Sequence, residues 1–169
     1  PYAATKKAGE LLCHTYHHLF GLQIDCLRFF TVYGPRQRPE MAIHKFADAM
    51  LDGRPITIYG DGTSARDYTY IDDILHGITA ALEQPKGYRV LNLGGTQTIP
   101  LSDLVHLLAE RLACSPKVEY LPNQAGDVSI TSADVTRARE EIGYSPKVAL
   151  EDGLSRFADW IHRIRKTPN

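Results

Sequence analysis

The sequence predicts a mixed α/β fold, and three observations support this prediction. Short apolar runs typical of strands alternate along the chain with longer stretches in which apolar residues recur every three or four positions, as in helices. Hydrophobic residues make up 43% of the chain and charged residues 23%, which is ordinary globular usage. A length of 169 residues is enough to bury a substantial core. We therefore expect an α/β protein without repeats or low-complexity tracts.

The first elements are a helix and a strand. Alanines and leucines spaced along residues 3–20 predict a helix, and Gly21 is a typical stop signal for it. Residues 24–30, with the sequence Ile-Asp-Cys-Leu-Arg-Phe-Phe, predict a mostly buried strand. Gly34 and two prolines mark residues 31–40 as a loop.

The central part of the chain continues this alternation. Residues 41–52 predict a helix because their apolar side chains fall on one face. Residues 56–59 predict a short strand, and the glycines after it open a loop. We expect Asp72 to cap a helix over residues 73–83, whose isoleucines and leucine are spaced by four.

The last part of the chain adds further strands and helices. Residues 89–93 predict a strand that ends at two glycines, and residues 101–113 form the clearest amphipathic helix. Three more elements are expected: a strand at 117–121, a short helix capped by Asp134 and ending at Gly143, and a helix at 150–166.

Composition excludes several classes of partner. The 19 lysines and arginines nearly balance the 20 aspartates and glutamates, so bulk charge provides no attraction to nucleic acid or anionic lipid. No apolar run approaches the roughly 18–20 residues of a membrane span. The three cysteines are widely spaced and form no CxxC motif, so we predict no metal site. Reduced thiols fit a cytoplasmic protein best.

The first candidate for chemistry is Tyr2-Ala-Ala-Thr-Lys6. On a helix, residues four apart share a face, so Lys6 would lie beside the Tyr2 phenol. A neighbouring ammonium favours the phenolate form of a tyrosine, which can then remove a proton from a sugar hydroxyl. A chance coincidence of a common spacing is the alternative interpretation.

The second candidate runs from Arg28 through Thr31 to Arg38. A strand leads into a Gly-Pro turn that carries two arginines, and ligands of open α/β sheets bind beyond the carboxyl ends of strands. Arg38 could hold a carboxylate or a phosphate through two parallel hydrogen bonds. A solvated basic loop remains equally compatible with the motif.

The third candidate extends from Tyr59 to Tyr68 around two glycines. Tyr59 could stack on a base and Arg66 could neutralise a diphosphate, although a hairpin with a surface ion pair fits as well. A weaker candidate is Asp127, which could accept hydrogen bonds from ribose hydroxyls or could simply belong to a turn.

Taken in order, these motifs resemble the carboxy-terminal half of an extended short-chain dehydrogenase/reductase, and more closely a nucleotide-sugar epimerase. The resemblance extends from the first residue to about residue 160. The segments that carry it are Tyr2-x-x-x-Lys6, Arg28-Phe-Phe-Thr-Val-Tyr-Gly-Pro35, Ile56-x-Ile-Tyr-Gly-Asp-Gly62, Arg66-Asp-Tyr-x-Tyr-Ile-x-Asp73, Leu91-Asn-Leu-Gly94, Gly126-Asp-Val128, Ala133-Asp134 and Gly143-Tyr-x-Pro146.

The resemblance implies two lobes and a start within a longer fold. Residues 1–32 and 66–94 would complete a Rossmann-like, doubly wound NAD-binding sheet, and residues 33–65 and 95–169 would form a smaller lobe that binds the nucleotide sugar. The chain would begin at the catalytic tyrosine and lack the glycine-rich dinucleotide loop, so we expect it to be inactive alone. Family members commonly form homodimers through helices equivalent to residues 3–20.

The resemblance also implies roles for individual residues. Tyr2 and Lys6 would be catalytic, and together with Phe29 and Val32 would contact NAD. The 4-hydroxyl of the sugar would be oxidised transiently to a ketone and reduced on the other face. The residues implied to bind the UDP-sugar are Thr31 and Arg66 at the diphosphate, Tyr59 at the uracil, Asp127 at the ribose and Arg38 at the sugar.

One part of the pattern favours a particular substrate. Thr31, where many members have Asn, followed by Val-Tyr-Gly-Pro-Arg-x-Arg-Pro-Glu-Met41, is most similar to UDP-glucuronate 4-epimerases, in which Arg38 would hold the uronic carboxylate. The alternatives within the family are a UDP-glucose 4-epimerase, a UDP-glucuronate decarboxylase and a nucleotide-sugar 4,6-dehydratase. A truncated, non-catalytic nucleotide-sugar-binding module is the remaining alternative.

Overall fold

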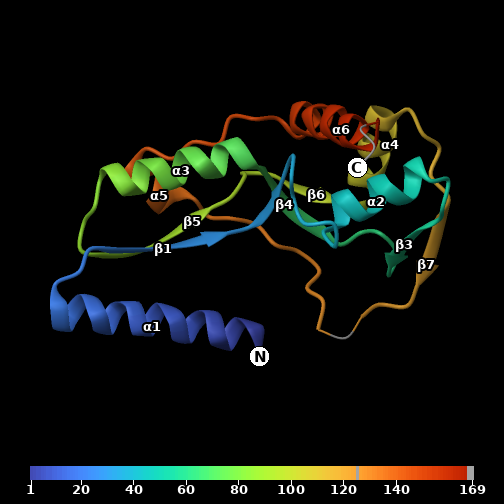
Figure 1. The fold of residues 1–169 in the computed structure, drawn as a ribbon. Helices are drawn as coiled ribbons and strands as arrows, with labels where there is room; N and C mark the ends of the chain where they lie inside the picture. Colours follow the sequence, from blue (N-terminus) through green and yellow to red (C-terminus); the bar gives the residue numbers. More distant parts are fainter. Residues whose placement is uncertain (125, 167–169) are drawn as a thin grey trace.

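A computed structural model describes residues 1–124 and 126–166 of the chain. In these residues helices and strands alternate as expected for an α/β fold (Figure 1). The elements are α1 (Tyr2–Phe20), β1 (Ile24–Phe29), β2 (Thr31–Tyr33), α2 (Ala42–Leu51), β3 (Ile56–Tyr59), β4 (Ala65–Tyr70), α3 (Ile71–Glu83), β5 (Tyr88–Leu93), β6 (Thr98–Pro100), α4 (Leu101–Leu112), β7 (Val118–Leu121), α5 (Thr136–Ile142) and α6 (Leu150–Lys166).

The first group of elements is built on the parallel strands β1 and β5. They pair in register from Ile24 opposite Tyr88 to Phe29 opposite Leu93. Helix α1 lies on one face of this pair, and α3 and α5 lie on the other (Figure 1). This three-layer arrangement is the one that a doubly wound sheet adopts.

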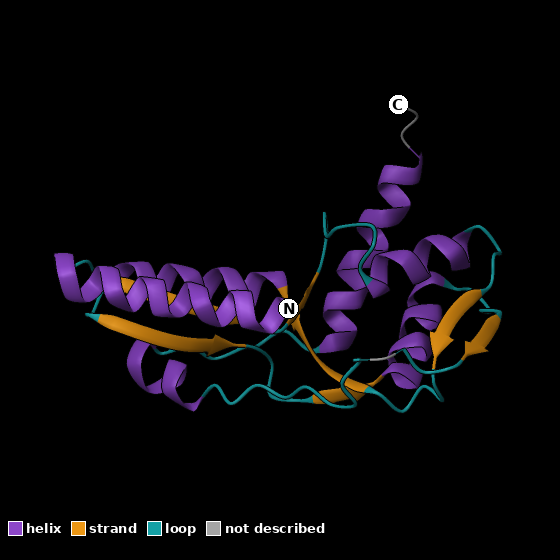
Figure 2. Ribbon diagram, turned by 90° about the horizontal axis from the view of Figure 1, so that it is seen from below, coloured by secondary structure: helices purple, strands orange, loops and turns teal. Residues whose placement is uncertain are grey.

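The second group packs α2, α4 and α6 beside the parallel strands β3 and β7 (Figure 2). Strand β4 connects the two groups. It pairs in parallel with β2 and antiparallel with β6. Residues 126–135 lead from the side of the second group to α5 in the first (Figure 1).

Two hydrophobic clusters form the core. The larger cluster lies in the second group and contains Tyr33, Phe46, Ile58, Leu108 and Phe157 among its buried side chains. The smaller cluster lies between β5, α3 and α5, and its buried members are Ile74, Ala81, Leu91, Leu93, Val135, Ala138, Ile142 and Tyr144. The expected division at residues 32, 65 and 94 stays a prediction. Helix α5, which that division assigns to the substrate lobe, packs here against α3 and β5.

The helix ends follow the sequence signals closely. Gly21 ends α1 in the left-handed conformation, with φ of 66°, and donates its N–H to the carbonyl of His17 at 2.8 Å. The prediction that Asp72 caps α3 is wrong, because this helix begins at Ile71 and places both Asp72 and Asp73 in its first turn. Buried Asp73 instead accepts the backbone N–H groups of Lys147 and Val148.

Three short strands were not expected from the sequence. Strand β2 occupies part of the predicted loop 31–40, and β4 and β6 follow glycine-containing segments. Strand β4 could not be predicted from the apolar pattern because it buries polar side chains. Asp67 and Thr69 are 0% and 1% exposed. The expectation that strand 24–30 is mostly buried is also wrong. Strand β1 is half-buried, and Phe29 at its end is 49% exposed.

Candidate active site

The amino-terminal turn of α1 carries the tyrosine and lysine of the first motif. The Lys6 ammonium lies 5.5 Å from the centre of the Tyr2 ring, so the two side chains share a helix face as their spacing predicts. Thr5 donates its hydroxyl to the Tyr2 carbonyl at 2.8 Å within the same turn. The Tyr2 ring is 74% exposed, so its phenol is open to a ligand.

A cavity of about 430 Å³, here called the tyrosine–arginine cavity, lies between this turn and the segment after β1. It brings together four residues predicted from the sequence, Tyr2, Phe29, Val32 and Arg38. The other lining residues are Phe30, Tyr33, Gly34, Pro35, Arg36, Gln37, Met41 and Ile71.

Arg38 is only weakly held inside this cavity. Its guanidinium lies 3.5 Å from a Glu40 carboxylate oxygen and 3.7 Å from the Met41 sulfur, and its side chain is 75% exposed. The group can therefore turn toward a bound carboxylate at little cost. Arg36 lines the same cavity with a left-handed φ of 66°, and sequence reasoning gave it no role although it stands in the same Gly-Pro-Arg-x-Arg segment.

A second cavity, of about 660 Å³, lies between α1 and β1. Tyr2, Lys6 and Phe29 line it together with Ala3, Lys7, Glu10, Cys26, Leu27 and Arg28. Glu10 was missed by sequence reasoning, although its carboxylate accepts hydrogen bonds from Nε and Nη2 of Arg28 and from the Lys7 ammonium. Hydrogen bonds from Arg28 and then Lys7 lower the pKa of Glu10 to about 2.

The residues expected at the nucleotide lie apart from this tyrosine. A third cavity of about 240 Å³ is lined by Tyr59 and Asp127, with Asp61, Thr63, Ser64, Asn123, Gln124, Val128 and Ser129. Arg66 donates to Asp127 Oδ1 at 2.6 Å and to the carbonyl of Ala65 at 3.0 Å. Arg66 and Asp127, which are 61 residues apart, therefore meet in one ion pair at the edge of this cavity.

Thr31, expected at the diphosphate, lies at the start of strand β2. It is half-buried in β2, its Cα pairs with that of Tyr68 in β4, and its neighbours Phe30 and Val32 line the tyrosine–arginine cavity. Among the described residues, Thr31 itself is outside the sets that line the three cavities.

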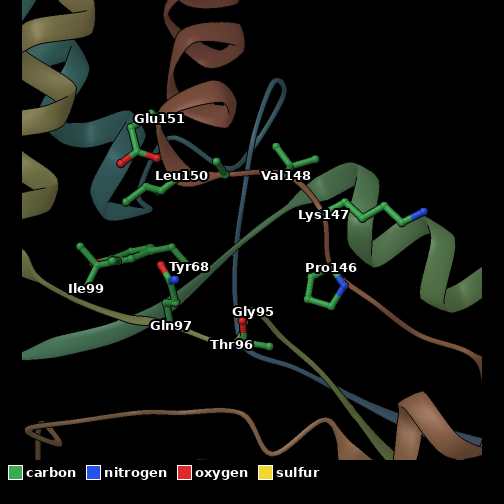
Figure 3. Close-up of a pocket in the computed structure, with 11 residues that line it drawn as sticks. Tyr68, Gly95, Thr96, Gln97, Ile99, Pro146, Lys147, Val148, Leu150 and Glu151 are labelled. Atoms are coloured by element: carbon green, nitrogen blue, oxygen red, sulfur yellow. The ribbon is translucent and has the colours of Figure 1, made fainter.

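A further cavity, of about 220 Å³, lies where β4, the segment after β5 and the segment before α6 meet (Figure 3). Tyr68, Gln97 and Leu150 line it, and Lys147 directs its ammonium away from it. Burial raises the pKa of the Tyr68 phenol to about 12, so this hydroxyl stays protonated. As far as the described residues go, this cavity contains none of the site residues predicted from the sequence.

Residues 1–124 and 126–166 contain no cluster of three or more His, Cys, Asp or Glu side chains that could hold a metal ion. Within these residues no helix has the length and the apolar character required to cross a bilayer.

Comparison with known proteins places the chain in a family. Residues 1–94, which include the Tyr2–Lys6 turn and strands β1 to β5, match the NAD dependent epimerase/dehydratase family. The chain belongs to this family. The match extends from the tyrosine motif through the end of β5 and so includes both strands of the β1–β5 pair.

Members of the epimerase/dehydratase family that resemble the chain include named 4-epimerases. A UDP-glucuronate 4-epimerase of Thermodesulfobacterium geofontis is 46% identical over 95% of this chain and 50% of its own length. The crystal structure of UDP-glucuronic acid 4-epimerase from Bacillus cereus in complex with UDP-glucuronic acid and NAD is 44% identical, with a TM-score of 0.91, over 97% of this chain and 53% of that one.

Other members of the epimerase/dehydratase family share the fold at lower identity. A UDP-glucose 4-epimerase of Thermotoga maritima with UDP-glucose is 32% identical, with a TM-score of 0.94, over 98% of this chain and 54% of that one. These matches confirm the Rossmann-like α/β fold class. The chain spans about half the length of the relatives it matches.

Proposed function

We propose that this chain contributes the catalytic tyrosine and the sugar-binding lobe of an NAD-dependent UDP-glucuronate 4-epimerase. The observation that carries the proposal is the tyrosine–arginine cavity. An exposed Tyr2 phenol and an exposed Arg38 guanidinium both line it. A base for a sugar hydroxyl and an anchor for a carboxylate are the two groups that this reaction needs. The identity of 44–46% to two UDP-glucuronate 4-epimerases supports the same substrate.

The residues around Tyr2 fit the nicotinamide end of NAD. Phe29 offers a half-exposed aromatic ring and Val32 an apolar side chain in the same cavity as Tyr2, and the Lys6 ammonium stands beside them as a donor for ribose hydroxyls. When bound, NAD supplies the acceptor and donor of hydride at the sugar C4. Tyr2, Lys6, Phe29 and Val32 are proposed to hold it there.

The proton at the sugar 4-hydroxyl is proposed to move through Tyr2. Its phenol oxygen is exposed to the cavity, where a sugar hydroxyl can reach it. Tyr2 is proposed to accept this proton when the sugar is oxidised and to return it when the ketone is reduced, with the Lys6 ammonium 5.5 Å from the centre of its ring. Arg38 would hold the uronic carboxylate through paired hydrogen bonds and so fix which ring atoms face Tyr2.

The UDP portion is proposed to lie along the third cavity. Tyr59, 37% exposed, offers its ring to the uracil, and Asp127 offers an acceptor to the ribose. Arg66, with Thr31, would bind the diphosphate. Because Arg66 and Asp127 pair with each other, we propose that substrate phosphate replaces Asp127 as the partner of Arg66 and releases the carboxylate for the ribose.

The assembly of the whole protein is part of the proposal. Helix α1 exposes the large apolar side chains Leu11, Leu12, Tyr16, Leu19 and Phe20, which support a homodimer formed through this helix. The thiols of Cys13, Cys26 and Cys114 are all free, which fits a cytoplasmic protein. Sedimentation velocity of the protein expressed from its complete reading frame tests the dimer.

Proton NMR of the sugar anomeric region tests the activity. The protein expressed from its complete reading frame, supplied with NAD and UDP-glucuronate, is expected to form UDP-galacturonate without net NADH. Formation of a UDP-pentose would identify a decarboxylase. Conversion of UDP-glucose but not UDP-glucuronate would make Arg38 an ordinary loop residue, and a 4-keto-6-deoxy product from a nucleotide glucose would identify a dehydratase. No reaction with any of these would leave a binding module.

Replacement of the tyrosine tests the mechanism. Tyr2→Phe keeps the ring but removes the phenol oxygen, so turnover should fall by at least about 100-fold while UDP binding stays intact. Tyr16→Phe is the matched control, because Tyr16 lies on the same helix, is also exposed and contacts Phe20 rather than the cavity. Near-normal turnover by Tyr2→Phe, measured by the same NMR assay, would show that another group moves the proton.

A further inference from the structure

An ion pair joins the helix of Tyr2 to the strand that leads to Phe29. Arg28, in β1, donates to the two Glu10 carboxylate oxygens at 2.5 and 2.8 Å, and Lys7 donates to one of them at 2.9 Å. The Glu10 side chain is 11% exposed, so the pair is shielded on the carboxylate side. Paired hydrogen bonds between guanidinium and carboxylate fix angle as well as distance.

A second contact holds the same turn of α1. The Tyr88 hydroxyl, from β5, donates to the Glu10 backbone carbonyl at 3.0 Å. Glu10 is therefore attached to both strands of the β1–β5 pair, through its side chain and its backbone. Burial is the largest cause that raises the pKa of the Tyr88 phenol, so this hydroxyl keeps the proton that it donates.

Few other contacts restrain the amino-terminal half of α1. Every residue of this helix is at least partly exposed, so close packing does not fix its position. Further along the helix, His14 and His17 contact the Tyr88 ring in β5. Of the side-chain hydrogen bonds and ion pairs between α1 and β1 in the described residues, the Glu10–Arg28 pair is the one nearest in sequence to Lys6 and Tyr2.

We propose that Glu10, acting through Arg28, is a positioning residue that sets the distance between the Tyr2–Lys6 turn and Phe29. The inference rests on the proposed function. Glu10 lies four residues after Lys6, about one helical turn, and Arg28 directly precedes Phe29. A hydrogen-bonded pair between Glu10 and Arg28 therefore holds the helix turn of Tyr2 at a fixed distance from the Phe29 ring. Glu10 is not assigned any contact with substrate.

Kinetics of charge-neutral variants test this role in the protein expressed from its complete reading frame. Glu10→Gln keeps the shape and removes the charge, and we expect kcat to fall about 10- to 100-fold because reacting groups are misplaced. KM for UDP-glucuronate should change less than about threefold, since Arg38 and the nucleotide contacts remain. Arg28→Gln should give the same pattern, and the double variant should be no worse than either single one.

Two further variants separate positioning from stability. Glu10→Asp keeps the charge on a shorter side chain and should recover part of the lost kcat. Asp72→Asn breaks a more exposed ion pair with Arg156, between α3 and α6, and should leave kcat unchanged. The inference is overturned if Glu10→Gln retains normal kcat, if the two single effects add in the double variant, or if Asp72→Asn lowers kcat equally.

A measurement without turnover keeps the inference separate from the proposed function. Hydrogen exchange of the backbone amides in residues 5–9 should become at least about tenfold faster in Glu10→Gln and stay unchanged in Asp72→Asn. If the parent protein turns over no UDP-sugar, the proposed function fails, and this exchange result alone decides whether Glu10 holds the turn. Unchanged exchange in Glu10→Gln would overturn the inference in either case.

Discussion

Single buried carboxylates hold distant segments of this chain together. Asp67, with 0% of its surface exposed, accepts the Thr69 hydroxyl and the backbone N–H groups of Gly95 and Ala133. These three donors come from β4, from the end of β5 and from the segment before α5. A buried carboxyl group is tolerated when its hydrogen bonds are complete, so Asp67 connects three segments of the chain.

Asp73 provides a residue-scale prediction about stability. Its two oxygens accept the N–H groups of Lys147 and Val148 at 2.9 and 3.0 Å, and it is 3% exposed. Asp73→Ala leaves both donors unpaired, so the free energy of unfolding should fall by about 2–4 kcal/mol. Asp72→Ala removes only an exposed ion pair with Arg156 and should cost less than about 1 kcal/mol. Urea unfolding followed by circular dichroism compares them, and equal losses would contradict the assignment.

Glu10 makes the stability of the chain depend on acid pH. Hydrogen bonds from Arg28 and Lys7 lower its pKa in the folded chain from 4.5 to about 2. A lowered pKa contributes stability that is complete above the unfolded value and is lost as pH falls through the folded value. The difference in unfolding free energy between the parent chain and Glu10→Gln should therefore be constant above about pH 5.5 and shrink steadily toward pH 3. Urea titrations at four pH values measure it, and a constant difference would contradict the pair.

Site residues differ in how far sequence could predict them. The Tyr2–Lys6 neighbourhood follows from helix geometry alone, since four residues separate them. The Arg66–Asp127 pair could not be predicted, because the two residues are far apart in sequence and meet only through the path of the chain after β7. Glu10 was missed for the same reason, since its partner lies on another element.

At the scale of elements, two helical glycines differ in the space available for a side chain. A Cβ at Gly9 in α1 would meet nothing within 4 Å, whereas a Cβ at Gly77 in α3 would lie 2.8 Å from Leu93 Cδ1 and 2.9 Å from Tyr144 Cδ2. Gly9→Ala should raise the free energy of unfolding by up to about 1 kcal/mol through helix propensity. Gly77→Ala should lower it by about 1–3 kcal/mol because the smaller cluster has no room. Thermal unfolding of the two variants checks the signs, and a stabilising Gly77→Ala would refute the packing described here.

Periodic helices were predictable and short strands were not. The helices over residues 101–113 and 150–166 are found within one residue, because their leucines and aromatic side chains recur on one face. Strands β2 and β6 are three residues long, too short for a periodic signal. Strand β4 contradicts the usual pattern, because it places an aspartate in the interior where backbone donors from other segments satisfy it.

On the scale of the whole molecule, the two clusters should unfold in separate steps. Trp160 is the only tryptophan, and it packs on the larger cluster beside His44 and Phe157. Leu91 is fully buried in the smaller cluster, so Leu91→Ala should cost about 2–5 kcal/mol there. We expect this variant to lower the midpoint seen by far-ultraviolet circular dichroism while Trp160 fluorescence keeps its midpoint.

A control variant completes this test. Leu108→Ala removes a comparable side chain from the larger cluster and should lower the fluorescence midpoint itself. If both probes shift together in both variants, the two clusters form one cooperative unit, and the expectation of separate steps is wrong.

The second edge of β1 has a practical consequence for handling the isolated chain. Among the described residues, β1 pairs only with β5, so its other side presents free N–H and C=O groups beside the uncovered leucines of α1. Such an edge can template the addition of further strands. Concentrated stocks should therefore turn turbid on standing and bind dyes specific for cross-β aggregates, so the chain is best stored dilute and used fresh.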